Sequence, residues 1–457
     1  MIKQFPGRGH IVPISLVLIG AAVLKAQLPP DASQTSANSV KVVNAFGQNW
    51  GFPGPLLEVS PGTFSGLTVG ATGTYNARAF LLTSQGALTT TYVFSTNSAV
   101  PGPFEVQAVN GRLYSGQGAP SEYFSLDLRG NIQFYPPVLP SPITFSVPTA
   151  DGKLYGTEST YIGDNAFGMV TLDGAVTVLH NFSAQEGIPY GLPILASDGN
   201  FYGISGLGGA NVSSSAMVYR MTPAGSLTIL ATYSDGRPNF GPGNSENLLQ
   251  ASNGKLYGTA AFGGKSHAGA IFEMSLNGAY KTLYEFTHWP NGMPATLIEA
   301  SDGNLYGVAQ SWVQIGGAPF LFRITLAGQF ETLARPIGTC PCPILQGSDG
   351  KIYGTSLNGG PDGIGAAWVW DLGLPKPLPK IKGLLPSSGA VGTSVTISGA
   401  HLLGATAVGF NGTPATLFSS VSNNFVTATV PPGAATGPVT ATTPNGSVTS
   451  SALFTVQ

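Results

Sequence analysis

Residues 302–307 read Asp302-Gly303-Asn304-Leu305-Tyr306-Gly307, and copies of this six-residue phrase recur along the chain. The second residue of the phrase is a glycine, which stands at positions 62, 111, 152, 199, 254, 303 and 350. Asp-Gly and Asn-Gly pairs followed by β-forming residues predict a type I′ hairpin turn that leads into a strand. Because consecutive glycines lie 41 to 55 residues apart, the spacing is typical of a propeller or a solenoid.

Further apolar runs accompany each phrase, and in one repeat the third and fourth runs are Ala270–Met274 and Tyr280–Phe286. Four strands in hairpin order are the unit of a β-propeller blade. The last repeat stops after its third run, Ala366–Trp370, whereas Lys41–Phe46 is a strand with no predecessor. Since these two deficits complement each other, the sequence predicts an all-β fold with a seven-bladed β-propeller over residues 41–374, closed by the N-terminal strand.

The repeat resembles the GloVer-type (Gloeo/Verruco) tandem repeat of bacterial surface proteins. The resemblance rests on the phrase at residues 302–307, on a Gly-Gly loop such as Phe262-Gly263-Gly264-Lys265, and on a Phe-centred third strand such as residues 270–274. It covers most of the chain and implies a secreted or surface-exposed repeat protein. It implies no particular reaction.

Composition excludes some classes of partner. Charged residues make up 9% of the chain and the formal net charge is −2, whereas about 25% charged residues is typical of globular domains. A nucleic-acid partner requires a basic surface, so none is expected. The 63 glycines and 36 prolines suit a turn-rich all-β protein.

The N-terminal region has the pattern of a secretory signal. Residues 1–26 combine Lys3 and Arg8 with the apolar run Ile11–Leu24, which is shorter than the roughly 20 apolar residues that a permanent membrane span needs. Residues 27–40 are expected to form a flexible lead-in. The sequence therefore predicts a secreted protein in the extracellular space, at the cell surface or in the periplasm.

The C-terminal region is expected to be a separate domain. Residues 375–380 alternate prolines and predict a stiff linker, and residues 381–457 contain short alternating strands that are typical of a β-sandwich. The order of these strands resembles an IPT/TIG immunoglobulin-like domain. Such domains bind DNA in transcription factors and form stalks in secreted proteins. Since residues 383–457 contain no Asp, Glu, Lys or Arg, the resemblance implies a spacer or adhesive role.

Candidate binding residues gather in the long connections that a propeller would place on one face, here called the long-loop face. Loops on a rigid scaffold often carry function, and an aromatic rim suits sugar rings or peptide side chains. The alternative is that these aromatics fill gaps between blades. The candidates are Trp50, Tyr190, Arg237, Phe240, His288, Trp289 and Trp312.

The two cysteines, Cys340 and Cys342, are separated by a single residue. In a secreted protein a pair of cysteines suggests a disulfide, but a ring this small would gain little chain entropy. A strained local disulfide and two free thiols are both compatible with the sequence.

The sequence contains no recognised catalytic motif. We interpret the periodic Asp151, Asp198, Asp302 and Asp349 as turn residues, and the recurring phrase tyrosines as packing residues. The expected function is that of a monomeric, non-catalytic binding or adhesion scaffold for glycans or cell-surface proteins, without cofactor or metal. A purely structural surface-layer component is a further alternative.

An enzymatic alternative is also open. A polysaccharide-acting hydrolase or lyase would use two carboxylates in the propeller funnel. The carboxylates available on the long-loop face are Asp164, Glu186, Asp235 and Asp362.

Overall fold

The computed structural model describes the chain from residue 40 onward, with gaps. The described residues are 40–47, 50–69, 77–94, 106–115, 123–135, 144–158, 165–206, 216–233, 248–260, 264, 266, 268–287, 293–310, 319–338, 343–360 and 363–457. In these residues all helix or strand structure is β-strand, as the sequence predicts for an all-β protein. The predicted signal peptide and residues 27–39 lie outside the described residues.

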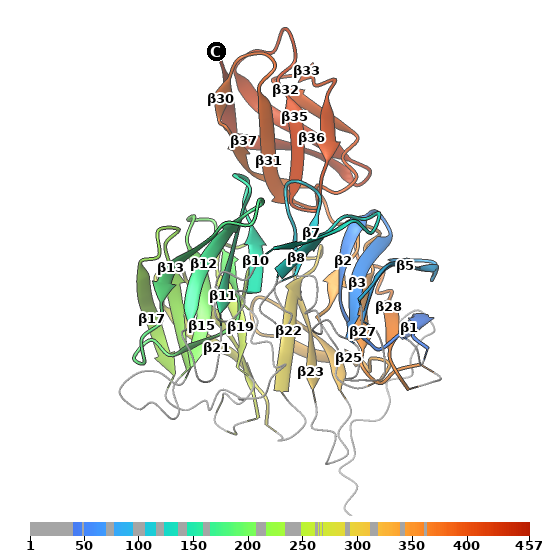
Figure 1. Cartoon of the computed structure of the whole chain (residues 1–457). Helices are drawn as coiled ribbons and strands as arrows, with labels where there is room; N and C mark the ends of the chain where they lie inside the picture. The colour runs from blue at the N-terminus through green and yellow to red at the C-terminus, as the bar shows by residue number, and fades with distance from the viewer. Residues whose placement is uncertain are drawn as a thin grey trace, which may run out of the picture.

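Strands β1 to β28 form seven four-stranded sheets (Figure 1). Six of these sheets each take four consecutive strands in hairpin order. Their first halves are, in chain order, β2 (Phe52–Ser60) with β3 (Thr63–Val69), β6 (Val106–Gln107) with β7 (Leu113–Ser115), β10 (Thr144–Pro148) with β11 (Lys153–Glu158), β14 (Ile188–Leu195) with β15 (Phe201–Gly206), β18 (Leu248–Gln250) with β19 (Leu256–Ala260), and β22 (Met293–Glu299) with β23 (Leu305–Gln310).

The second halves of the same six sheets contain the third and fourth strands of each repeat. They are β4 (Arg78–Thr83) with β5 (Leu88–Val93), β8 (Tyr123–Leu126) with β9 (Ile132–Tyr135), β12 (Ala166–Thr171) with β13 (Val176–Asn181), β16 (Ala216–Met221) with β17 (Leu227–Tyr233), β20 (Ala270–Met274) with β21 (Tyr280–Glu285), and β24 (Phe320–Ile324) with β25 (Phe330–Ala334). The predicted third strand of the fifth repeat coincides with β20.

The seventh sheet combines strands from the two ends of this region, in the order β1–β28–β27–β26. Its strands are β1 (Val40–Ala45), β26 (Leu345–Gln346), β27 (Ile352–Ser356) and β28 (Ala366–Trp370). β1 runs antiparallel to β28, with Val40 opposite Trp370 and Ala45 opposite Ala366. The fourth position of this sheet is therefore filled from the N-terminal end of the described chain.

The turn in the phrase is not of type I′, so that prediction is wrong. Gly303 has a φ of 79°, but the non-glycine residues with positive φ in the described chain are His401 and Asn411. The Gly303 N–H donates to Ala300 O at 2.9 Å and the Ala300 N–H donates to Asn304 O at 3.0 Å. This pattern is a three-residue hairpin loop in which glycine alone supplies the left-handed conformation. The Asp302 side chain accepts a hydrogen bond from the Asn304 N–H at 3.1 Å, and this contact favours the three-residue loop.

The last glycine of the phrase makes room for an aromatic ring on the neighbouring strand. A Cβ added to Gly66 would lie 2.5 Å from Cζ of Phe80, the residue opposite it on β4. Both partners are in the sheet interior, where Phe80 is fully buried. The equivalent pairs are Gly203 with Tyr219, Gly258 with Phe272, Gly307 with Phe322, and Gly354 with Trp368.

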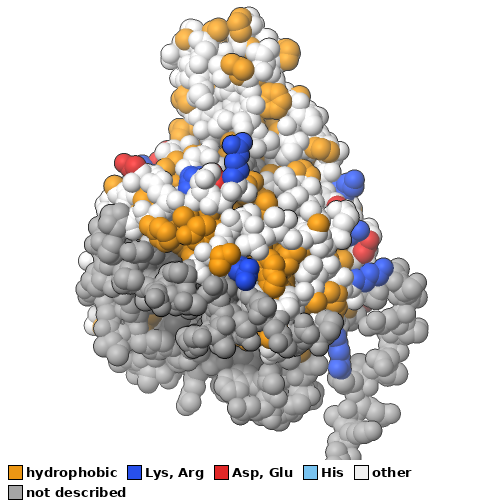
Figure 2. Space-filling model, turned by 45° about the vertical axis from the view of Figure 1, so that its right-hand side comes forward, with side chains coloured by type: hydrophobic (Ala, Val, Ile, Leu, Met, Phe, Trp, Pro, Cys, Tyr) orange, Lys and Arg blue, Asp and Glu red, His pale blue; other side chains and the backbone are white. Residues whose placement is uncertain are grey.

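The C-terminal region forms two sheets, in the orders β29–β31–β35–β34 and β30–β37–β36–β32–β33. In Figure 2 the upper part of this region displays hydrophobic and uncharged surface, in keeping with the absence of charged residues after residue 382. The strands are β29 (Lys380–Leu385), β30 (Ser388–Gly389), β31 (Ser394–Ala400), β32 (Ala407–Phe410), β33 (Thr413–Pro414), β34 (Phe418–Ser420), β35 (Phe425–Thr429), β36 (Gly437–Thr443) and β37 (Gly446–Val456).

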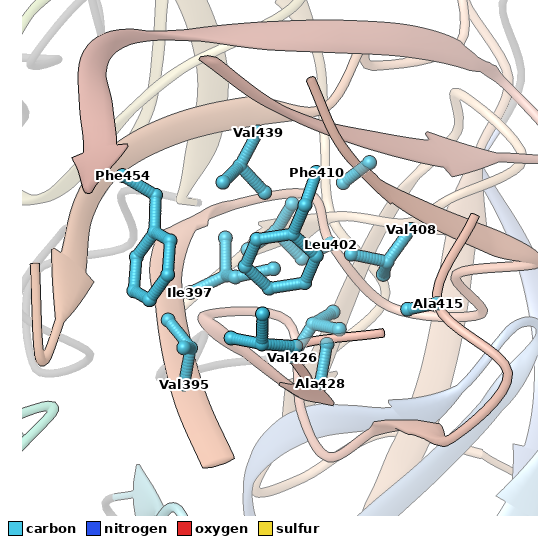
Figure 3. Close-up of a cluster of buried hydrophobic side chains, with 12 residues drawn as sticks. Val395, Ile397, Leu402, Val408, Phe410, Ala415, Val426, Ala428, Val439 and Phe454 are labelled. Carbon is cyan, nitrogen blue, oxygen red and sulfur yellow. The ribbon is translucent and has the colours of Figure 1, made fainter. Parts of the chain in front are cut away.

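An apolar core lies between these two sheets (Figure 3). Ile397 and Val426 come from one sheet, and Phe410 and Phe454 from the other. The two phenylalanine rings pack edge to face with centroids 5.3 Å apart. Burial of one such side chain contributes about 1.5–3 kcal/mol. Because two sheets enclose this apolar core, the region is a β-sandwich with a core of its own.

We expect Gly66→Ala to destabilise the protein by about 1–3 kcal/mol, because the added methyl group must displace the Phe80 ring. In a Phe80→Leu background the same change is expected to destabilise the protein by less than half as much. Chemical denaturation of the two single variants and the double variant measures this coupling. Equal destabilisation in both backgrounds would contradict the steric explanation.

Candidate functional site

The acidic or amide residue that opens a phrase binds the buried tyrosine four residues later. The Tyr306 hydroxyl donates to Asp302 Oδ2 at 2.9 Å, and Tyr306 is 2% exposed. The hydroxyls of Tyr202 and Tyr353 donate to Asp198 and Asp349 in the same way, at 2.9 and 2.8 Å. In two further copies the direction is reversed: the side-chain amides of Asn110 and Asn253 donate to the hydroxyls of Tyr114 and Tyr257, at 2.9 and 2.8 Å. These phrase side chains therefore anchor the turn to the sheet interior.

The electrostatics of the phrase agree with this structural role. Burial raises the pKa of Tyr202 to about 12, and its hydrogen bond to Asp198 adds to that shift. The same two causes raise the pKa of Tyr306 to about 12. Each hydroxyl is thus a stable donor to its carboxylate near neutral pH. Asp151 differs, because its Oδ1 accepts instead from the Thr149 hydroxyl at 2.6 Å.

A second set of contacts, which the sequence analysis missed, connects four of the seven phrase turns to a neighbouring sheet. The Ser252 N–H donates to Glu299 Oε2 at 2.8 Å and the Ser252 hydroxyl to Oε1 at 2.5 Å. The signal is a serine two residues before the phrase glycine and a Glu or Gln four residues before the next one. Related contacts join Ser197 to Gln250, Ser301 to Gln346, and Ser348 to Glu58.

The contact of Ser348 with Glu58 lies at what we call the seam, the junction of strands β26–β28 with strands β1–β5. The Ser348 N–H donates to Glu58 Oε2 at 2.9 Å, and its hydroxyl to Oε1 at 2.7 Å. Thr355 Oγ1 donates to Gly54 O at 2.8 Å across the same junction. Burial raises the pKa of Glu58, while hydrogen bonds from Gly62 and Ser348 act in the opposite direction.

Trp50 packs against the interior of the seam. Its ring centroid lies 6.0 Å from that of Phe46 and 6.3 Å from that of Phe80, and the side chain is half-buried. The Arg78 guanidinium stands over the indole, 5.3 Å from its centroid. Trp50 is thus held by aromatic and cation–π contacts, and a substitution there would disturb packing as well as any binding role.

The other candidate residues are not brought together in the described structure. Tyr190 belongs to β14, where it lies opposite Ile204, so its assignment to a long connection is wrong. The remaining candidates lie outside the described residues: Arg237, Phe240, His288, Trp289, Trp312, Cys340 and Cys342. So do three of the four carboxylates of the enzymatic alternative, Asp164, Asp235 and Asp362.

The fourth carboxylate, Glu186, accepts several hydrogen bonds. Its Oε2 accepts from the Ser183 N–H at 2.7 Å and from the Ser183 hydroxyl at 2.8 Å, and it lies 3.2 Å from Nε2 of His180. Burial acts to raise the Glu186 pKa, but these hydrogen bonds outweigh it and the pKa is lowered. Because Ser183 donates to the carboxylate and not to the imidazole, the cluster lacks the arrangement of an activated nucleophile. His180 lies on β13, the fourth strand of its sheet.

The described residues hold no group of three or more His, Cys, Asp or Glu side chains arranged to bind a metal ion. They also contain no helix that is long and apolar enough to cross a membrane.

Comparison with protein families identifies both parts of the chain. Residues 142–368 match the Gloeobacter/Verrucomicrobia repeat, and residues 379–456 match the IPT/TIG domain. The chain is therefore a Gloeobacter/Verrucomicrobia repeat protein with a C-terminal IPT/TIG domain. No curated protein matches the sequence.

Solved structures similar to the chain have mixed activities. A streptogramin B lyase is 17% identical with a TM-score of 0.41, covering 71% of this chain and 99% of its own. The WD40 β-propeller domain of Doa1 is 11% identical with a TM-score of 0.46, covering 72% and 97%. A fungal alcohol oxidase of the AA5 family, in complex with copper, is 14% identical with a TM-score of 0.48, covering 92% and 100%. Similarity at this level identifies no shared substrate.

We expect the replacement Glu58→Gln to change how stability depends on pH. A carboxyl whose pKa is raised on folding contributes stability that is fully present below its unfolded pKa of about 4.3 and is lost as the pH rises through the folded value. The free energy of unfolding of the wild type, minus that of the variant, should therefore fall as the pH rises above 4.3. Chemical denaturation between about pH 4 and 7 tests this, and a constant difference would contradict it.

Proposed function

We propose that this protein is a secreted, non-catalytic binding or adhesion scaffold whose partner is a glycan or a cell-surface protein. The proposal rests on the contacts that the side chains of the repeated phrase make. Asp198, Asp302 and Asp349 hold buried tyrosines, and the repeating serines are bonded to the next sheet. The periodic polar residues thus build the scaffold, and the residues that differ between repeats are left for recognition.

The family matches support the same class of function. Repeat proteins use extended surfaces for binding. The IPT/TIG region has no charged side chain from residue 383 onward, so this part of it offers no basic surface for nucleic acid. No described cluster favours the hydrolase alternative, since Glu186 is tied to Ser183 and His180.

The binding function depends on the scaffold, which we propose to be a closed seven-bladed β-propeller over residues 41–374, followed by a linker at 375–380 and the sandwich at 381–457. The pairing of β1 with β28 supports this closure. So does the apolar cluster at the seam, in which Phe64 and Tyr353 pack with ring centroids 4.4 Å apart. Closure leaves the rigid long-loop face that the proposal requires.

Removal of β1 tests the closure. We expect a chain that begins at residue 47 to melt at least about 5 °C below a chain that begins at residue 40, because β28 then loses the hydrogen bonds and packing of its outer partner. A synthetic peptide of residues 40–46 should restore part of the loss, and a scrambled peptide should not. Equal melting temperatures for the two truncated chains would refute the closure.

Binding to an array of neutral and charged glycans and cell-wall polymers tests the function. We expect Trp289→Ala with Trp312→Ala to reduce binding at least tenfold, since loss of one buried aromatic contact at a binding site typically weakens affinity by that factor or more. Phe134→Ala, which removes an aromatic side chain that is 47% exposed on β9, is the matched control and should bind normally.

Three outcomes would count against this proposal. Binding that is unchanged in the double tryptophan variant would exclude the long-loop face as the glycan site. If the wild type binds no glycan, the glycan form of the proposal is refuted. A protein partner is then favoured, and crosslinking on intact cells would identify it. Release of shortened polymers would favour the hydrolase or lyase.

A further inference from the structure

The end of the sandwich nearest the other sheets touches three phrase turns that follow one another across the seam. Asn445 Nδ2 donates to Ser348 O, in the turn between β26 and β27, at 2.7 Å. A Cβ added to Gly404 would lie 2.7 Å from Cγ of Pro61, in the turn between β2 and β3. Figure 1 shows the sandwich standing over this end of the sheets, near β2 and β7.

The third contact extends to the next sheet. A Cβ added to Gly111, in the turn between β6 and β7, would lie 3.8 Å from Cγ1 of Val421. By contrast, a Cβ added to Gly199, Gly254 or Gly303 would meet no atom within 4 Å. The sandwich therefore covers the phrase turns at the seam and leaves those of three other sheets uncovered.

The linker is held in place by the same group of residues. Asn445 Nδ2 also donates to Pro377 O at 3.2 Å, and Pro375 O accepts from the Ser301 hydroxyl and from Gln346 Nε2, the latter at 3.3 Å. Pro377 is buried. A linker held at Pro375 and Pro377 keeps the sandwich close to the seam, which raises the effective concentration of its contacts there.

The seam is the place where such contacts matter most. Strands β1–β5 and β26–β28 come from opposite ends of the repeat region, and hydrogen bonds and packing hold them to each other. We propose that the IPT/TIG domain acts as a clasp that stabilises the seam, because it is hydrogen-bonded to Ser348 on one side of the junction and lies next to Pro61 and Gly111 on the other. Opening the seam requires at least one of these contacts to break.

A full-length double variant, Asn445→Ala with Val421→Ser, tests the clasp. We expect the amides of β1 and β28 to exchange hydrogen about tenfold faster than in the wild type, since the variant loses both side-chain hydrogen bonds of Asn445 and places a polar side chain next to Gly111. Exchange in β15 and β16, which lie away from the seam, should not change. Small-angle X-ray scattering of the same sample reports whether the sandwich has moved away from the sheets.

The matched control is Ser420→Ala, which removes a hydrogen bond inside the sandwich, from the Ser420 hydroxyl to Leu402 O at 3.2 Å. Exchange at the seam should be normal in this variant. If the amides of β1 and β28 exchange in the double variant at the wild-type rate, the clasp is refuted, whether or not the sandwich moves. An equal acceleration in β15 and β16 would overturn it too, as a sign of general destabilisation. None of these readouts depends on a glycan or protein partner.

Discussion

The hydrogen bond between the residue that opens the phrase and the tyrosine four residues later, made in five of the seven copies, is the constraint on which the repeat depends. A tyrosine hydroxyl inside a sheet stack must find a partner, because an unpaired buried polar group is expensive. Asp302 meets that need for Tyr306 at 2.9 Å and also accepts from the backbone of its own turn. One side chain thereby holds both the turn and the buried tyrosine of the following strand in place. The last glycine then admits the aromatic ring of the third strand, and the preceding serine binds the next sheet.

Much of the fold could be predicted from the sequence, because its signals are local. The third and fourth strands followed from apolar runs between glycine turns, and β20 and β28 lie where the runs lie. The turn type could not be predicted from the dipeptide, because the Asp side chain bonds to its own turn and leaves glycine as the single left-handed residue. Around Tyr190, the residues Pro189, Gly191 and Pro193 are unfavourable in a strand interior, yet a first strand at the edge of its sheet tolerates proline.

The candidate site was less predictable for a different reason. Glu299 stands inside an apolar run, so its contact with Ser252 of the preceding sheet has no local signal, and only comparison between repeats would show it. The docking contact of Asn445 is equally hidden, since Asn445-Gly446 has the sequence of an ordinary hairpin turn. Contacts between distant segments depend on how sheets are placed in space, and neither periodicity nor composition records that. The packing of Trp50 against Phe46 and Phe80 belongs to the same class.

The pairing of β1 with β28 also sets an order of events during synthesis. Val40 lies opposite Trp370, so the first of the described strands to leave the ribosome is among the last to be paired. Until then its backbone donors and acceptors form an open strand edge, which other chains could occupy. Contacts so far apart in sequence form slowly, because a long loop must close first. For a chain that crosses a membrane while unfolded, the delay would carry over to the far side, where the two ends would meet only after almost the whole repeat region had arrived.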